Sequence, residues 1–180
     1  MKTKFLALLV TGAAIATPAN ANSPDNAKLN FSCQSNDGVP ITVAQFADNE
    51  AQLPVFYWQA EAIANKSDDT PQELCNVVAA KLEDYSAQGY DLSNINFVGT
   101  EQGGLPVICA NAGGTACSKI LLTLNKAEQP DVVASDLVDS ILNKNLQSEK
   151  IEYRKRGVQS ISYQVNFWSL LGLTPKNFGK

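Results

Sequence analysis

Four cysteines constrain this fold more than any other feature of the sequence. Cys33, Cys75, Cys109 and Cys117 form an even set in a chain of 180 residues. In an exported chain, an even set of cysteines indicates structural disulfides. Four cysteines allow three pairings. Because Cys109 and Cys117 flank a loop that contains two glycines, we expect a bridge at the base of a hairpin there, which leaves Cys33 to pair with Cys75.

The beginning of the chain has the three parts of an export signal. A basic start precedes an apolar stretch, Phe5 to Ile15, and Ala19-Asn20-Ala21 is a small-x-small cleavage site. Cleavage there removes residues 1–21 and two of the 14 basic residues, so that 12 Lys+Arg remain against 18 Asp+Glu, a net charge of −6. We therefore expect an exported protein.

The composition excludes several function classes. The chain has no histidine, which rules out a Ser-His-Asp triad, a Cys-His pair and a histidine-ligated metal. A net acidic chain without a long basic stripe is not expected to bind nucleic acid. After the signal, no apolar run approaches the ~20 residues that a transmembrane helix needs. We expect no cofactor, no metal and no transmembrane helix in the mature chain.

A mature chain of this length is expected to form one core domain. We expect a flexible lead at residues 22–27, a core domain at 28–146 and a C-terminal strand and helix segment at 147–180, whose order the sequence leaves open. Period-two alternation and turn signals predict the strands. The predicted strands cover residues 28–33, 40–46, 53–58, 94–99, 105–110, 119–124 and, near the end of the chain, 158–165.

Two principal helices complete the expected fold. Thr70-Pro71-Gln72-Glu73 combines an N-cap threonine, a proline at the first helical position and a capping-box glutamate. This helix should end at Gly89, and a second should cover residues 130–143, while residues 59–69 should form a loop. The sequence thus predicts an α+β domain, with an antiparallel sheet of five or six strands, two principal helices and two disulfides.

The C-terminal segment combines basic and apolar residues, which is typical of a membrane-surface contact. The alternative is a last strand and a short helix that dock on the core. The candidate contact residues for a membrane or a protein partner are Lys150, Arg154, Lys155, Arg156, Phe167, Trp168, Leu170 and Leu171.

The chain resembles the circadian oscillating protein family of cyanobacteria. The matching pieces contain the four cysteines in order and cover most of the mature chain. They are Phe31-Ser32-Cys33-Gln34, Gly38 to Val43, Val55 to Trp58, Thr70 to Cys75, Leu105 to Cys109 and Cys117 to Leu124. The resemblance implies an exported protein in the periplasm, in the thylakoid lumen or outside the cell, peripheral to a membrane, with no established biochemical role.

Three functional hypotheses remain open from the sequence. The first is a non-catalytic envelope or lumenal module that binds an unknown protein partner or a membrane surface. The second is a hydrolase that uses two carboxylates, which requires a cleft with a pair of acids. The third is a disulfide oxidoreductase, against which the absence of a Cys-x-x-Cys pair argues. The same absence argues against a zinc site.

Overall fold

A computed structural model of the chain describes residues 29–47, 50–90, 92, 94–112, 117–147, 150–155 and 158–170. The predicted signal peptide, residues 1–21, and the predicted lead, residues 22–27, lie outside the described residues. No helix in the described ranges is both long enough and apolar enough to cross a membrane.

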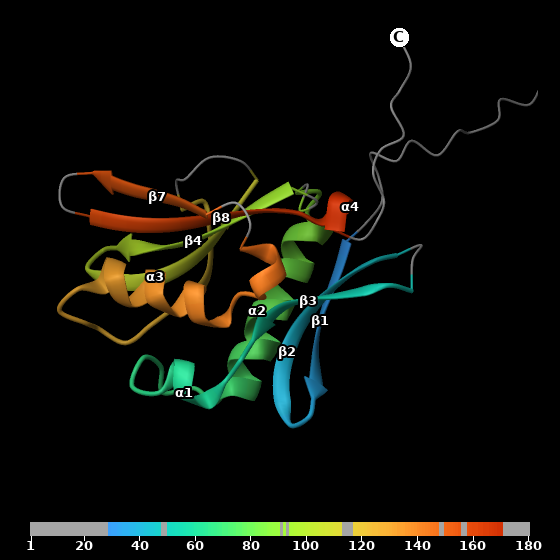
Figure 1. Ribbon diagram of the computed structural model, residues 1–180, viewed down its shortest axis with the longest axis horizontal. Helices are drawn as coiled ribbons and strands as arrows, with labels where there is room; N and C mark the ends of the chain where they lie inside the picture. Colours follow the sequence, from blue (N-terminus) through green and yellow to red (C-terminus); the bar gives the residue numbers. More distant parts are fainter. Residues whose placement is uncertain are drawn as a thin grey trace, which may run out of the picture.

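The described chain contains eight strands, four α-helices and a 3-10 helix (Figure 1). In chain order these are β1 (Leu29–Asn36), β2 (Val39–Phe46), β3 (Gln52–Tyr57), α1 (Ala60–Ile63), α2 (Pro71–Ala87), β4 (Asn94–Gln102), β5 (Leu105–Asn111), β6 (Lys119–Thr123), α3 (Pro130–Ile141), η2 (Lys144–Leu146), β7 (Lys150–Lys155), β8 (Val158–Asn166) and α4 (Phe167–Leu170).

The predicted α+β class is confirmed, with antiparallel strands and two principal helices, α2 and α3. The strands divide into a three-stranded sheet of order β1-β2-β3 and a five-stranded sheet of order β6-β5-β4-β8-β7. The sequence analysis did not separate the two sheets. It left docking of the last strand on the core as an alternative, and in the structure β8 docks between β4 and β7.

Two further elements differ from the sequence analysis. Residues 59–69, which were predicted to form only a loop, contain the single-turn helix α1. The charged stretch Lys150–Lys155 forms β7, which was not predicted as a strand because its residues are mostly charged. An edge strand tolerates charge because only one of its sides is hydrogen-bonded to a neighbouring strand, so its other side faces solvent.

The hairpins use the turns that their residues favour. Asp37 and Gly38 join β1 to β2 with φ values of 50° and 81°, and Gly103 and Gly104 join β4 to β5 with φ values of 62° and 81°. Two consecutive positive φ angles are typical of a type I′ turn, whose twist matches that of paired strands.

Helix α2 begins and ends as predicted. Thr70 accepts a hydrogen bond from the backbone N–H of Glu73, and the Glu73 carboxylate accepts one from the backbone N–H of Thr70. Gly89 follows the helix with a φ of 82°, the left-handed conformation that commonly ends a helix. The helix is thus positioned by local sequence signals at both ends.

Side chains of α2 cap the outer edge of β1. The backbone N–H of Phe31 donates to the Glu83 carboxylate at 2.8 Å, and the Ser86 hydroxyl donates to the carbonyl of Leu29 at 2.7 Å. Unpaired backbone groups at a sheet edge invite pairing with another chain. These two contacts satisfy such groups of Leu29 and Phe31 within the domain.

The same helix caps the outer edge of β6 in the second sheet. Lys81 Nζ donates to the Leu121 carbonyl at 2.9 Å, and the Tyr85 hydroxyl donates to the Ile120 carbonyl at 3.2 Å. Helix α2 therefore joins the two sheets by bonding to an edge strand of each.

The outer edge of β3 is covered by the segment that follows α3. Asn143 donates its backbone N–H to the Val55 carbonyl at 2.9 Å and its side-chain amide to the Pro54 carbonyl at 2.7 Å. Three of the four sheet edges are therefore bonded to other parts of the domain. In the described part of the chain, no other element bonds to the backbone at the outer edge of β7.

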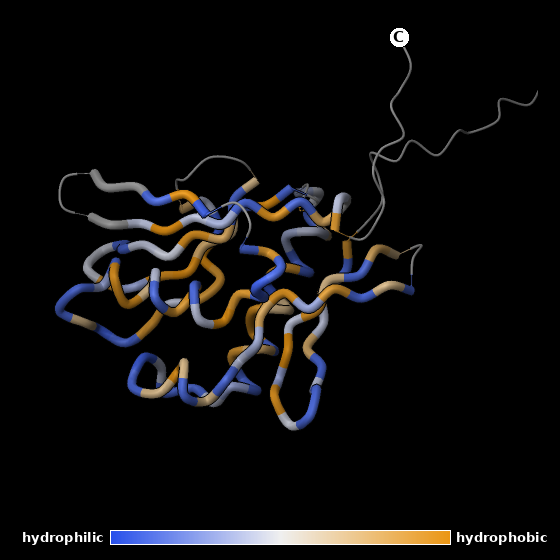
Figure 2. Tube along the Cα trace, viewed as in Figure 1, coloured by the Kyte–Doolittle hydropathy of each residue, from blue (hydrophilic) through white to orange (hydrophobic). Residues whose placement is uncertain are grey.

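The two sheets share one apolar core. Phe56 of β3 and Phe97 of β4 meet edge to face, with ring centroids 4.8 Å apart, and both are fully buried. Figure 2 shows hydrophobic residues concentrated along the strands and helices, whereas the loop after α1 is hydrophilic. The core therefore spans both sheets and does not divide the chain into two domains.

Helix α3 packs directly on β4 at Gly99. A Cβ atom added at Gly99 would lie 2.5 Å from the carbonyl oxygen of Ala134 and 2.7 Å from the Cα atom of Ser135. The Ser135 hydroxyl donates to the Gly99 carbonyl at 3.2 Å. Only glycine allows this close approach of the helix to the strand.

We predict that Gly99→Ala destabilises the domain. The added methyl group would overlap helix backbone, which cannot move aside as a side chain can, so the free energy of unfolding should fall by about 1–3 kcal/mol. Urea unfolding followed by circular dichroism measures the change. The exposed substitution Thr123→Ser is the control and should stay within about 0.5 kcal/mol of the wild type. An unchanged midpoint for Gly99→Ala would contradict the close packing.

Both predicted disulfides are confirmed. Cys33 of β1 is bonded to Cys75 of α2, and Cys109 of β5 is bonded to Cys117, which precedes β6. Their sequence separations are 42 and 8 residues. The first bridge ties α2 to the three-stranded sheet, and the second closes the hairpin between β5 and β6.

We predict that the longer bridge stabilises the domain more. Loop-closure entropy gives about 4 kcal/mol for the Cys33–Cys75 bridge and about 2.5 kcal/mol for the Cys109–Cys117 bridge. Urea unfolding of the double variants Cys33→Ala/Cys75→Ala and Cys109→Ala/Cys117→Ala, with the oxidised wild type as reference, tests the order. A larger loss for the second variant would contradict it.

Candidate functional site

Three of the predicted basic contact residues, Lys150, Arg154 and Lys155, lie on the outermost strand of the five-stranded sheet. Lys150 begins β7, and its ammonium lies 3.6 Å from Asp139 and 3.4 Å from Glu152. It also lies 6.0 Å from the centroid of the Tyr163 ring. Lys150 is therefore charge-paired at the surface, and its side chain is 36% exposed.

Arg154 and Lys155 lie at the other end of β7. Arg154 is in register with Gln159 and Lys155 with Val158, which places both beside the turn between β7 and β8. The description of these two residues covers only their backbone, and Arg156 lies outside the described residues. The basic cluster predicted from sequence is thus spread along one edge strand.

Phe167, predicted to be a contact residue, is a core residue. Its side chain is fully buried, and its ring meets that of Phe31 edge to face at 6.0 Å between centroids. A side chain inside the core cannot contact a membrane or a partner, so this prediction was wrong. Leu170 is 40% exposed. The side chain of Trp168 and the whole of Leu171 lie outside the description.

The structure separates Arg154 and Lys155 from helix α4, whereas Lys150 is in register with Tyr163 near the α4 end of β8. Helix α4 follows the end of β8, as Figure 1 shows, whereas Lys155 is in register with Val158 at the start of that strand. With a rise of about 3.3 Å per residue, the strand separates them by about 26 Å. Arg154 and Lys155 therefore do not form one patch with helix α4.

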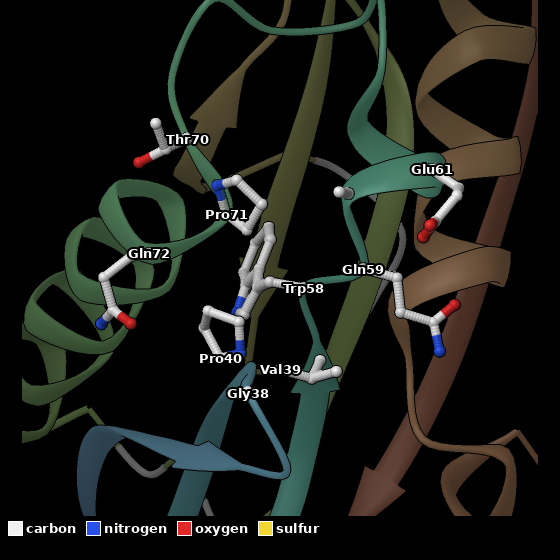
Figure 3. Close-up of a pocket in the computed structure, with 10 residues that line it drawn as sticks. Gly38, Val39, Pro40, Trp58, Gln59, Glu61, Thr70, Pro71 and Gln72 are labelled. Carbon is white, nitrogen blue, oxygen red and sulfur yellow. The ribbon is translucent and has the colours of Figure 1, made fainter.

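A cavity lies elsewhere, between the turn of the β1–β2 hairpin, the end of β3 and the start of α2. It has a volume of about 430 Å³. In Figure 3 the Trp58 ring lies between Pro40 and Pro71. Trp58 is almost fully buried, and its indole N–H donates to the Thr42 hydroxyl at 2.9 Å. The floor of this cavity is consequently rigid and mostly apolar.

The polar groups at this cavity are mostly neutral. Gln59, Glu61 and Gln72 are among the residues that line it, and Glu61 is the single carboxylate there. A two-carboxylate hydrolase needs a pair of acids across the cleft, and this cavity offers one. In the described residues, no three cysteines or acidic side chains gather to hold a metal ion. All four cysteines are in disulfides.

Sequence reasoning did not identify the open edge of β7 or this cavity. The proline at position 71 was assigned only to helix initiation, and Trp58 only to a buried strand. The cavity brings together residues from 38 to 72 whose proximity depends on tertiary packing. The charged character of β7 was the available signal for an edge strand, since charges mark unprotected edges.

The capping carboxylate beside this cavity has a perturbed pKa. Hydrogen bonds from the backbone and then from the side chain of Thr70 lower the pKa of Glu73 from its ordinary value of 4.5. A lowered pKa in the folded state means that the carboxylate contributes stability above pH 4.5, and that this contribution is lost as the pH falls through the folded-state value.

We predict that Glu73→Gln lowers stability at neutral pH but much less at acid pH. The glutamine keeps an acceptor oxygen but has no charge, so it should unfold at a lower urea concentration than the wild type at pH 7. At pH 3 the difference should shrink because the wild-type carboxyl is then increasingly protonated. Urea unfolding midpoints of the variant and the wild type at pH 7 and pH 3 measure this difference in stability. The exposed substitution Glu128→Gln is the control. A difference that is constant with pH would contradict the capping role of the charge.

Comparison with known proteins gives one match. A family model described as Circadian oscillating protein COP23 matches residues 30–171. No curated protein and no solved structure matches the chain. The match confirms the resemblance found in the sequence, and it spans both sheets and both disulfides.

Proposed function

The chain belongs to the circadian oscillating protein COP23 family, and from this premise we propose that it is a non-catalytic, exported binding module that takes up an acidic strand of a protein partner along the outer edge of β7. The family assigns no chemistry to the chain, so the proposal is argued from the structure. The observation on which it depends is that β7 is the sheet edge left open in the described residues.

Export is supported by the predicted signal peptide and by the two disulfides. Disulfides persist in oxidising compartments such as the periplasm and are rare in the cytosol. Both bridges join elements of the folded core, β1 with α2 and β5 with the segment before β6. They are therefore structural bridges.

An open edge strand offers a row of backbone donors and acceptors to an extended peptide. Main-chain hydrogen bonds then supply affinity, and the side chains of the edge strand select the partner. β7 contains Lys150, Arg154 and Lys155 but only one acid, Glu152. The charge of the strand favours an acidic partner segment, although the protein as a whole is acidic.

A protein partner is favoured over a membrane surface because of how the apolar residues are placed. Peripheral membrane binding combines basic charge with apolar side chains that enter the interface. Here Phe167 is buried in the core, and α4 lies at the end of β8 that is far from Arg154 and Lys155. The apolar residues that the sequence grouped with the basic ones thus do not lie beside Arg154 and Lys155.

We predict that an eight-residue peptide alternating glutamate and valine binds the mature protein, and that the variant Lys150→Glu/Arg154→Glu/Lys155→Glu binds it at least tenfold more weakly. The reversal replaces attraction by repulsion along the strand. Isothermal titration calorimetry at low and high salt measures both affinities. The matched control Lys126→Glu/Lys144→Glu changes two exposed lysines outside β7 and should bind like the wild type.

A second peptide separates strand addition from charge attraction alone. The same peptide methylated at alternate backbone nitrogens keeps its charge but cannot form main-chain hydrogen bonds, and it should bind at least tenfold more weakly. Equal binding of both peptides would overturn strand addition. Flotation of the same variants with anionic liposomes completes the test, because liposome binding without peptide binding would assign the basic strand to a membrane surface.

A further inference from the structure

A second cavity lies at the opposite edge of the five-stranded sheet, between the C-terminal turn of α2 and the pair β5 and β6. Its volume is about 170 Å³. Aromatic and aliphatic groups form most of its wall, and its lining residues include one with an ammonium group, Lys119. The lining residues that matter here are Tyr85, Tyr90, Leu92, Ala110, Ser118 and Lys119.

Lys119 is held between the two tyrosine rings. Its ammonium lies 4.0 Å from the ring centroid of Tyr90 and 5.0 Å from that of Tyr85. The rings meet each other at 6.3 Å with an interplanar angle of 76°. Cation–π contacts of this kind fix the position of an ammonium without neutralising its charge.

The ammonium of Lys119 has no acidic partner in the described part of the chain. The phenol of Tyr85 does not supply a negative charge either. Burial raises the pKa of Tyr85, even though Lys119 acts to lower it, and the phenol donates its proton to the Ile120 carbonyl. The cavity therefore presents a positive charge on an otherwise apolar wall.

Ser118 is fixed next to this ammonium. Its backbone N–H and its hydroxyl both lie 2.7 Å from the side-chain oxygen of Asn111, to which they donate. The preceding residue, Cys117, is bonded to Cys109 of β5. The disulfide and the asparagine therefore hold the segment that positions Lys119 at the cavity.

The size of the cavity restricts its occupant. Cavities that bind drug-sized molecules measure about 300–1,000 Å³, whereas an apolar cavity of about 150 Å³ accepts benzene. A volume of about 170 Å³ thus fits one ring or a short aliphatic chain. An anionic group attached to such a ring or chain would face Lys119.

We propose that this cavity, at Tyr85, Tyr90 and Lys119, binds a small organic anion: a carboxylate attached to an apolar body of about one ring. Tyr90 is 43% exposed, and its ring forms the wall that a ligand meets on entry. The carboxylate pairs with the ammonium of Lys119, while the body lies against the tyrosine rings and Ala110. The site lies at the β6 side of the sheet and is independent of the β7 edge.

The test titrates benzoate into the full mature protein, with acetate, benzamide and benzylamine as comparison probes. Isothermal titration calorimetry should show benzoate binding with a dissociation constant below about 1 mM, at least tenfold tighter than each of the other three. Acetate lacks the apolar body, benzamide lacks the charge, and benzylamine is a cation at neutral pH. Equal affinity for benzoate and benzamide would overturn the role of the charge, and undetectable benzoate binding would overturn the site.

Variants identify the residues that bind the anion. Lys119→Met keeps the apolar stem and should weaken benzoate binding at least tenfold, whereas Lys119→Arg should retain most of it. Tyr90→Ala removes an exposed wall and should also weaken binding. Lys126→Met is the matched lysine control and should bind like the wild type. Thermal melts confirm that each variant is folded.

Two results of the variant series test the proposal most directly. Unchanged benzoate binding by folded Lys119→Met would overturn the proposal. The β7 charge-reversal variant should bind benzoate like the wild type, so a failure of strand addition at β7 and a failure of this cavity are distinguishable.

Discussion

The position of α2 between two sheet edges is the constraint on which the rest of the structure depends. Its residues Glu83 and Lys81 bond to backbone groups of β1 and β6, which belong to different sheets. A backbone group left without a partner in the interior costs about 1–3 kcal/mol, so the helix and the two edges stabilise one another. The disulfide between Cys75 and Cys33 ties the same helix to the first sheet. One cavity lies at each end of this helix, and both are therefore formed by its placement.

The parts of the fold that sequence predicts are those set by local signals. The capping box at Thr70 and Glu73 fixes where α2 begins, because both hydrogen bonds lie within four residues. The Cys109–Cys117 bridge follows from eight residues of separation around a loop. Alternation of apolar residues similarly predicts most of the strands, since each strand needs one buried face.

The division into two sheets and the role of the C-terminal segment depend on contacts between distant residues. Phe31 and Phe167 share a core contact although they lie at opposite ends of the described chain. The charged residues from 150 to 155 gave no strand pattern in the sequence, whereas an edge strand accommodates these charges. Both cavities likewise combine elements whose proximity no local pattern specifies. The sequence therefore predicts the elements better than it predicts the site.

The manner in which each edge is protected bears on what β7 can bind. At the edges of β1 and β6, backbone groups are already bonded to side chains of α2, which hinders pairing with another strand. β7 is protected by charge, which leaves its backbone accessible. Lys150 is paired with Asp139 and Glu152, and the other basic residues of the strand are Arg154 and Lys155. Two copies of this chain that met along β7 would place like charges together, which disfavours self-association. An acidic strand of another protein would meet no such repulsion, so the charges of this edge favour the proposed acidic partner over a second copy of the chain.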